Sequence, residues 1–174
     1  MSKFNSKITK SLCLLIFLNS CAYFNTFYNA KSTFELAENM RISENEIENI
    51  NRNDYYNKAI EKSDIIIKDF SNSKYVDEAK FIKAKSLYFL SRYEESNIIF
   101  SDIITSENLE FYDEAKYWKS MIKFKNNQNI EAINDLNELL NEVDKNELKS
   151  QILLSIGEIN LNNYDYDNAY INFK

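Results

Sequence analysis

The sequence predicts an all-α protein, an α-solenoid built from successive pairs of antiparallel helices and preceded by an export signal. Three observations lead to this prediction. The 174 residues contain no proline and one glycine, Gly157, so few positions break a helix or suit a tight β-turn. A similar segment recurs at a period typical of repeat architectures. Hydrophobic residues make up 44% of the chain, which is enough to form a core between helices.

The first 20 residues have the pattern of an export signal. Lysines precede an apolar run at 11–18, which is too short to span a bilayer as a helix. The run ends at Leu18-Asn19-Ser20-Cys21, which resembles the lipobox of bacterial lipoproteins. This resemblance implies cleavage before Cys21 and attachment of acyl chains such as palmitate to it, and two or three chains would anchor the protein almost permanently. An ordinary secretory signal followed by a chance cysteine is the alternative.

The mature chain is expected to begin with a separate helix. A helix over 22–40 would carry five aromatic or small residues on one face: Tyr23, Phe27, Ala30, Phe34 and Ala37. Residues 41–53 are rich in Asn and Glu and predict a loop or frayed helix that leads to a second helix at 54–69. We therefore divide the mature chain into an N-terminal region at 21–53 and a helical array at 54–174.

The repeat is clearest in two segments that contain the same Asp-Glu-Ala-Lys core. Tyr75-Val76-Asp77-Glu78-Ala79-Lys80-Phe81 recurs as Phe111-Tyr112-Asp113-Glu114-Ala115-Lys116-Tyr117, so Asp77 corresponds to Asp113, 36 residues later. Small residues also recur where the second helix of each pair opens: Ala59, Ser96, Ala132 and Ala169. A small side chain there lets two helices pack closely, while apolar residues spaced by three and four bury their faces against neighbouring pairs.

These features resemble the tetratricopeptide repeat (TPR) over roughly residues 53–174. The resemblance implies that the first helix of each pair lines a concave groove that receives a peptide. By register, the lining would include Phe81, Lys85, Tyr88, Phe89, Tyr117, Met121 and Phe124. A place in the core between repeats is the alternative for each of them. The last helix would be about two turns long, so we expect the final repeat to be incomplete, since such arrays usually need a terminal cap.

Composition argues against several kinds of function. Loss of the signal leaves 18 basic and 27 acidic residues, a net charge of −9, which argues against a nucleic-acid partner. The chain has no histidine, and one glycine cannot form a phosphate-binding loop. We expect no catalytic residue, metal or cofactor. Hydrolysis by the acidic pairs Asp77/Glu78 and Asp113/Glu114 stays open, but their place at predicted helix starts favours a structural role.

Three segments together resemble the TPR lipoproteins of the BamD type, which belong to the outer-membrane β-barrel assembly machinery. They are the lipobox, the aromatic-rich residues 21–31, and Asn72-Ser73-Lys74-Tyr75-Val76-Asp77-Glu78-Ala79. The resemblance implies a periplasmic scaffold anchored in the outer membrane, whose partners are the assembly barrel subunit and segments of unfolded barrel proteins. The alternative is a TPR lipoprotein adapter in cell-envelope division, peptidoglycan coordination or polysaccharide export.

Overall fold

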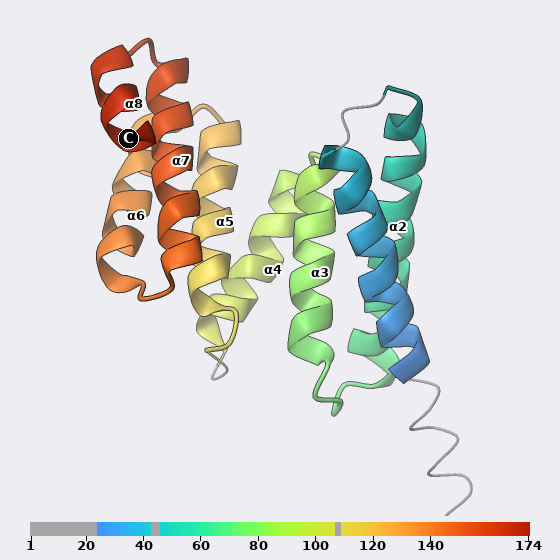
Figure 1. Cartoon of the computed structure of the whole chain (residues 1–174). Helices are drawn as coiled ribbons and strands as arrows, with labels where there is room; N and C mark the ends of the chain where they lie inside the picture. Colours follow the sequence, from blue (N-terminus) through green and yellow to red (C-terminus); the bar gives the residue numbers. More distant parts are fainter. Residues whose placement is uncertain (1–23, 43–45, 107–108) are drawn as a thin grey trace, which may run out of the picture. The chain divides into compact units, whose positions relative to one another are not determined.

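The computed structural model describes residues 24–42, 46–106 and 109–174, and all regular structure in these ranges is helical (Figure 1). The export signal, Cys21 and Tyr23 lie outside the described residues, so cleavage and lipidation stay predictions. The chain divides into two compact units, Met1–Leu90 and Ser91–Lys174. Within the described ranges, no helix combines the length and the apolar character needed to cross a bilayer.

The described part of the first unit consists of a helix at 24–42, α2 (Glu46–Asp69) and α3 (Val76–Phe89). Figure 1 shows α2 running in the opposite direction to the other two helices. The three helices share one hydrophobic core, which contains Phe27, Ala59, Ile66, Ala79 and Ile82. α2 begins eight residues before the expected position 54, because residues 46–53 contain neither glycine nor proline and continue the helix.

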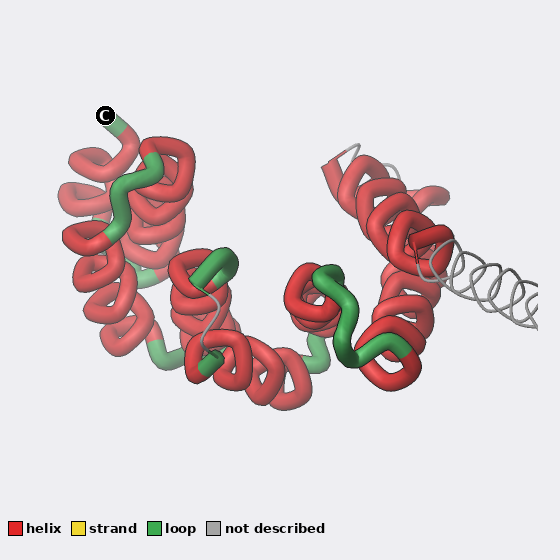
Figure 2. Tube along the Cα trace, turned by 90° about the horizontal axis from the view of Figure 1, so that it is seen from below, coloured by secondary structure: helices red, strands yellow, loops and turns green. Residues whose placement is uncertain are grey.

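The second unit is a series of hairpins that stack on one another (Figure 2). Each helix packs on the next one along the chain, and α5 also contacts α7. The hydroxyl oxygens of Tyr117 on α5 and Ser155 on α7 lie 2.8 Å apart in a buried hydrogen bond. Contact between alternate helices is what stacked antiparallel pairs require, and it confirms the predicted pairing. The helices are α4 (Tyr93–Thr105), α5 (Tyr112–Lys125), α6 (Asn129–Glu142), α7 (Asn146–Asn162) and α8 (Tyr166–Phe173).

The recurring small residues lie where helices pack most closely. The four predicted from the repeat are at most 3% exposed: Ala59, Ser96, Ala132 and Ala169. The equivalent first-helix positions, Ala84, Ser120 and Gly157, are buried as well. The ring of Phe173 on α8 occupies the space that a Cβ atom on Gly157 of α7 would need. The repeat therefore marks positions at which a larger side chain would separate two helices.

A lysine on the first helix of a pair bonds to the preceding helix in each unit. Lys83 Nζ on α3 lies 2.5 Å from Asp64 Oδ1 on α2. Lys119 Nζ on α5 donates to Ser101 Oγ on α4 over 2.8 Å. The two lysines are 36 positions apart, like the repeat itself. The lysine therefore occupies the equivalent repeat position in both units. Its acceptor is a carboxylate in the first unit and a hydroxyl in the second.

Three of the turns that join successive helices each contain one left-handed residue. Ser91, Asn127 and Tyr164 have φ angles of 60°, 62° and 62°. After α5, Gln128 N donates to Lys123 O over 2.9 Å, the backbone bond of a Schellman motif, and the turn after α7 has the equivalent bond. A left-handed backbone costs a residue with a side chain about 1–2 kcal/mol, which glycine avoids.

We expect Tyr164→Gly to raise the free energy of unfolding by about 1 kcal/mol, because glycine relieves the left-handed strain. The Tyr164 side chain is 79% exposed, so its loss removes little packing. Tyr170→Gly is the matched control, since Tyr170 is an exposed tyrosine inside α8, where glycine is expected to lower stability by about 0.5–1 kcal/mol. Chemical denaturation measures both changes, and equal losses of stability would contradict the prediction.

Candidate functional site

The seven predicted groove residues divide between the two units. Phe81, Lys85, Tyr88 and Phe89 lie on α3 of the first unit, whereas Tyr117, Met121 and Phe124 lie on α5 of the second. That all seven line one groove therefore stays a prediction.

The three residues on α5 are buried within the described structure. Tyr117, Met121 and Phe124 are 5%, 6% and 9% exposed. The Tyr117 hydroxyl is engaged with Ser155, and its ring meets the Trp118 ring edge to face at 5.2 Å. These three side chains occupy core positions, which was the alternative given for them, and they present little surface to a peptide.

The first unit contains a cluster of cationic and aromatic side chains, which we call the cation–aromatic cluster. α3 contributes residues at four-residue intervals, so they share one face of the helix. The helix at 24–42 contributes a second face at three- and four-residue spacing, and α2 adds two residues one turn apart. The members are Phe34, Glu38, Arg41, Arg52, Tyr56, Phe81, Lys85 and Phe89.

Lys85 is a partly buried cation held between aromatic rings. Its Nζ lies 4.8 Å from the centroid of the Phe34 ring and 5.9 Å from that of Phe81. Burial lowers the pKa of Lys85 below its ordinary value, while the negative charge of Glu38 raises it and the positive charge of Arg41 lowers it further. The ring faces attract the ammonium group and offset part of the cost of its burial. An anion placed beside Lys85 would be attracted by its positive charge.

Glu38 fixes the position of the second cation. Arg41 donates from Nε and Nη2 to the two carboxylate oxygens of Glu38, each over 3.1 Å, and its Cζ lies 4.7 Å from the centroid of Phe89. Tyr56 donates its hydroxyl to Glu38 over 2.5 Å, and its ring stacks on Phe89 at 5.3 Å. Burial, followed by the bond to Glu38, raises the pKa of Tyr56, so its hydroxyl keeps its proton. Arg41 is thus held rigidly over the ring.

The cluster carries more positive than negative charge, although the mature chain as a whole is predicted to be acidic. It contains three cations, Lys85, Arg41 and Arg52, and one carboxylate, Glu38. Arg52 Nε is buried and has no hydrogen-bond partner within the described part of the chain. A buried donor without a partner costs roughly 1–3 kcal/mol, and an acceptor on a ligand would remove that cost. The cluster is therefore suited to a ligand that combines a carboxylate with an apolar or aromatic group.

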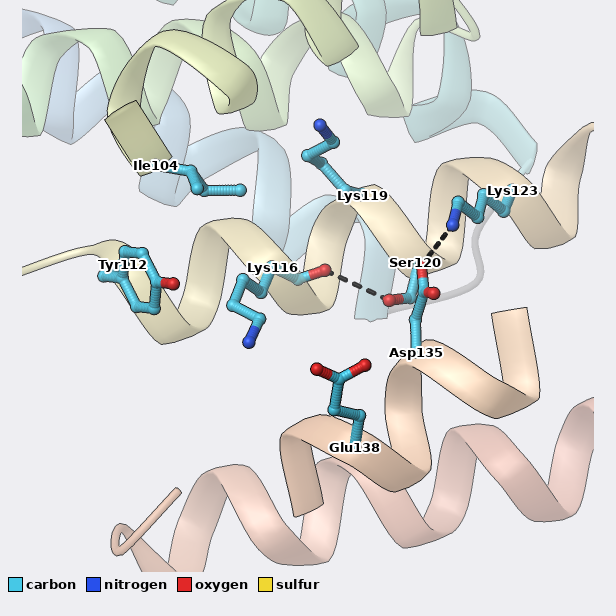
Figure 3. Close-up of a pocket in the computed structure, with 8 residues that line it drawn as sticks. All are labelled: Ile104, Tyr112, Lys116, Lys119, Ser120, Lys123, Asp135 and Glu138. Atoms are coloured by element: carbon cyan, nitrogen blue, oxygen red, sulfur yellow. Dashed lines mark hydrogen bonds and ion pairs between the residues drawn. The ribbon is translucent and has the colours of Figure 1, made fainter. Parts of the chain in front are cut away.

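The second unit has a cavity of about 300 Å³ between α4, α5 and α6, and most of the residues that line it are charged (Figure 3). Figure 3 shows Lys116 and Glu138 pointing toward one another across it, and Lys123 bonding to Asp135 over 2.5 Å. Lys116 also pairs with Glu142 at 2.6 Å. The charges of this cavity are largely balanced within the unit, so it offers less to an ionic ligand than the cation–aromatic cluster does.

The acidic pairs considered for hydrolysis lie in the first turns of α3 and α5, as predicted. Glu78 forms an ion pair with Lys31 at 2.9 Å, and Glu114 forms one with Lys145 at 2.7 Å. The glutamate of each acidic pair thus links its helix to a neighbouring helix or turn, which fits a structural role for these residues. Among the described residues, no three metal-ligating side chains of histidine, cysteine, aspartate or glutamate come together.

Sequence reasoning identified three members of the cation–aromatic cluster, Phe81, Lys85 and Phe89. It missed Glu38, Arg41, Arg52 and Tyr56 as site residues, and it gave Phe34 only as one of the residues on one face of the first helix. The spacing of Glu38 and Arg41 by three is a signal for an ion pair on one helix, but it does not reveal which helix they face.

Comparisons with known proteins support the fold. No family model and no curated protein matches the chain. Among solved structures, it is similar to the crystal structure of MamA, a TPR-like helical protein. The TM-score is 0.50 at 15% sequence identity, and the match covers 83% of this chain and 74% of that chain. Together with the stacked hairpins, this likeness gives the chain a TPR-type fold.

We expect the stability of the protein to depend on pH through Lys85. Because folding lowers its pKa, the unfolded chain binds the proton more tightly, and the free energy of unfolding rises as the pH approaches the ordinary pKa of 10.5. Lys85→Met removes this contribution. The difference in free energy of unfolding between wild type and Lys85→Met should therefore increase between about pH 7 and pH 9.5.

Chemical denaturation at several pH values measures this difference. The upper limit avoids Tyr56, whose raised pKa works in the opposite direction above its ordinary value of 10.0. Lys58→Met is the control, because Lys58 is an exposed lysine 5.2 Å from the centroid of the Tyr55 ring. A difference that stays constant with pH for Lys85→Met would contradict the assignment of Lys85 as a desolvated cation.

Proposed function

We propose that this chain is a lipid-anchored periplasmic scaffold that binds proteins or peptides and does not act as an enzyme. The TPR-type fold supports this proposal because stacked helix pairs present side chains of several helices on one continuous surface. The observation that carries it is the cation–aromatic cluster, in which Lys85, Arg41 and Arg52 lie among aromatic rings. Such a combination of charge and apolar surface suits recognition of a peptide.

Binding would use the two kinds of group in the cluster together. A carboxylate of the partner would lie near the positive charges of Lys85 and Arg52. An aromatic or aliphatic side chain of the partner would pack against Phe81 or Phe89. The ion pair with Glu38 keeps Arg41 in place before the partner arrives, which lowers the entropic cost of binding.

The specific role that we propose is assembly of outer-membrane β-barrel proteins, as in proteins of the BamD type. The supporting observations are the lipobox, the aromatic residues after Cys21 and the junction at 72–79. The partners would be the assembly barrel subunit and segments of unfolded barrel proteins. An adapter in envelope division, peptidoglycan coordination or polysaccharide export would use the same kind of binding, so the identity of the captured partner distinguishes the two roles.

We expect affinity capture of the full-length lipidated protein from detergent to recover the assembly barrel subunit. Lys85→Gln should reduce recovery about tenfold, the effect of losing one charged hydrogen bond. Lys58→Gln, which removes a lysine outside the cluster, should leave recovery unchanged. Cell-wall or export proteins in the absence of any assembly barrel would reject the proposed role, and equal recovery with both variants would reject the cation–aromatic cluster as the binding site.

We expect Cys21→Ser to abolish labelling of the protein by a fatty acid and to release it from membranes into the soluble fraction, because the acyl chains supply most of the membrane affinity. Metabolic labelling followed by separation of inner and outer membranes measures both effects and locates the wild-type protein. A wild-type protein that carries no label would contradict the proposed anchor.

A further inference from the structure

One end of the first unit gathers aromatic side chains at the first described residues, three positions after Cys21 in the sequence. The helix at 24–42 begins there, beside the turn that joins α2 to α3 (Figure 1). The rings of Phe27 and Tyr75 stack at 4.3 Å, and the Phe24 ring lies 6.3 Å from Tyr75. These contacts fix the first turn of the helix against the start of α3. We call this region, residues 24–31 and 68–78, the proximal end.

Two large aromatic residues at the proximal end face outward. Phe24 is 54% exposed and Tyr28 is 60% exposed. They are four residues apart on one helix, so they project from the same side. Aromatic side chains are favoured at the boundary between lipid and water, where an apolar ring meets the headgroups.

The position of Cys21 limits how far this end can lie from a membrane. Phe24 follows Cys21 by three residues, and three residues span at most roughly 11 Å even when fully extended. Acyl chains on Cys21 would therefore hold the Cα atom of Phe24 within about 11 Å of the headgroups, and that of Tyr28, four helical residues later, within about 17 Å, whatever conformation the connecting residues adopt.

The charge of the proximal end also permits contact with lipid. Lys31, Lys68 and Lys74 balance Asp69, Asp77 and Glu78, so this region has no net charge although the mature chain would carry −9. The turn at 69–74 forms an open cleft of about 370 Å³, lined by Lys74, Asp69, Phe70 and three polar residues. Its one lysine and one carboxylate balance, so this surface does not repel anionic lipid.

We infer that the proximal end rests on the bilayer surface, with Phe24 and Tyr28 inserted among the lipid headgroups. The anchor then determines how the first unit is oriented, in addition to attaching it. This inference rests on the proposed lipidation of Cys21. It specifies the surface that meets the membrane, which lipidation alone leaves open.

The test places a tryptophan at the proposed contact in the full-length lipidated protein. Trp118 is the one tryptophan of the chain, so Trp118→Phe provides a silent background. In that background, Tyr28→Trp is reconstituted into phospholipid vesicles that contain brominated acyl chains, which quench nearby tryptophan. We expect the emission to shift to the blue and to fall by roughly half, as for a side chain 5–10 Å below the surface. Phe24→Trp should behave similarly.

Tyr170→Trp in the same background is the matched control, because Tyr170 is 67% exposed on α8 of the second unit. Its emission should be unchanged by brominated lipid.

Vesicle-bound protein whose Tyr28→Trp and Phe24→Trp emission is not quenched would overturn the inference while leaving the anchor intact. Protein that carries no acyl chain and does not float with the vesicles would instead show that the proposed anchor is wrong. Shielding of these probes by a partner protein, without quenching by lipid, would also overturn the inference.

Discussion

Close packing at small side chains is the constraint on which both units depend. Ala59 and Ala79 lie in the core of the first unit, and Ser96, Ala132 and Ala169 are buried in the second. Adding carbon atoms at such positions forces helices apart and typically costs about 1–3 kcal/mol. Because each contact joins neighbouring helices, the stability of the fold is approximately the sum of contributions from separate interfaces. Polar groups can therefore be accommodated at one interface without disturbing the others.

The cation–aromatic cluster is an example of polar groups accommodated at one such interface. Lys85 is largely buried, Arg52 Nε has no hydrogen-bond partner among the described residues, and Glu38 pairs with one of the three cations, Arg41. Stability alone would favour apolar residues in these places. Charged groups that are kept in place at a cost in stability are available to bind a ligand. Binding sites commonly lower the stability of the protein in this way. The helix at 24–42 supplies three of the eight residues of this site, as many as α3 does.

The register of the helix pairs could be predicted because it depends on local patterns. Ala132 and Ala169 mark the openings of helices in sequence and in structure, and Phe27, Ala30 and Ala37 are buried as their spacing predicts. The start of α2 was predicted too late, since composition rich in Asn and Glu weakens a helix without ending it. Tyr56 and Glu38 were missed because their bond joins residues 18 apart, and no periodicity within one helix indicates such a contact.

The lysine bonds between successive helices bear on how such a chain can evolve. Lys83 bonds to a carboxylate on the helix before it, whereas Lys119, one repeat later, bonds to a hydroxyl. Copies of a repeat that arise by gene duplication start out interchangeable, but these interfaces no longer are. The lysine is the same at both interfaces, so the preceding helix alone, through Asp64 or Ser101, determines whether the interface contains an ion pair. Divergence at a single acceptor has thus made the two interfaces chemically different.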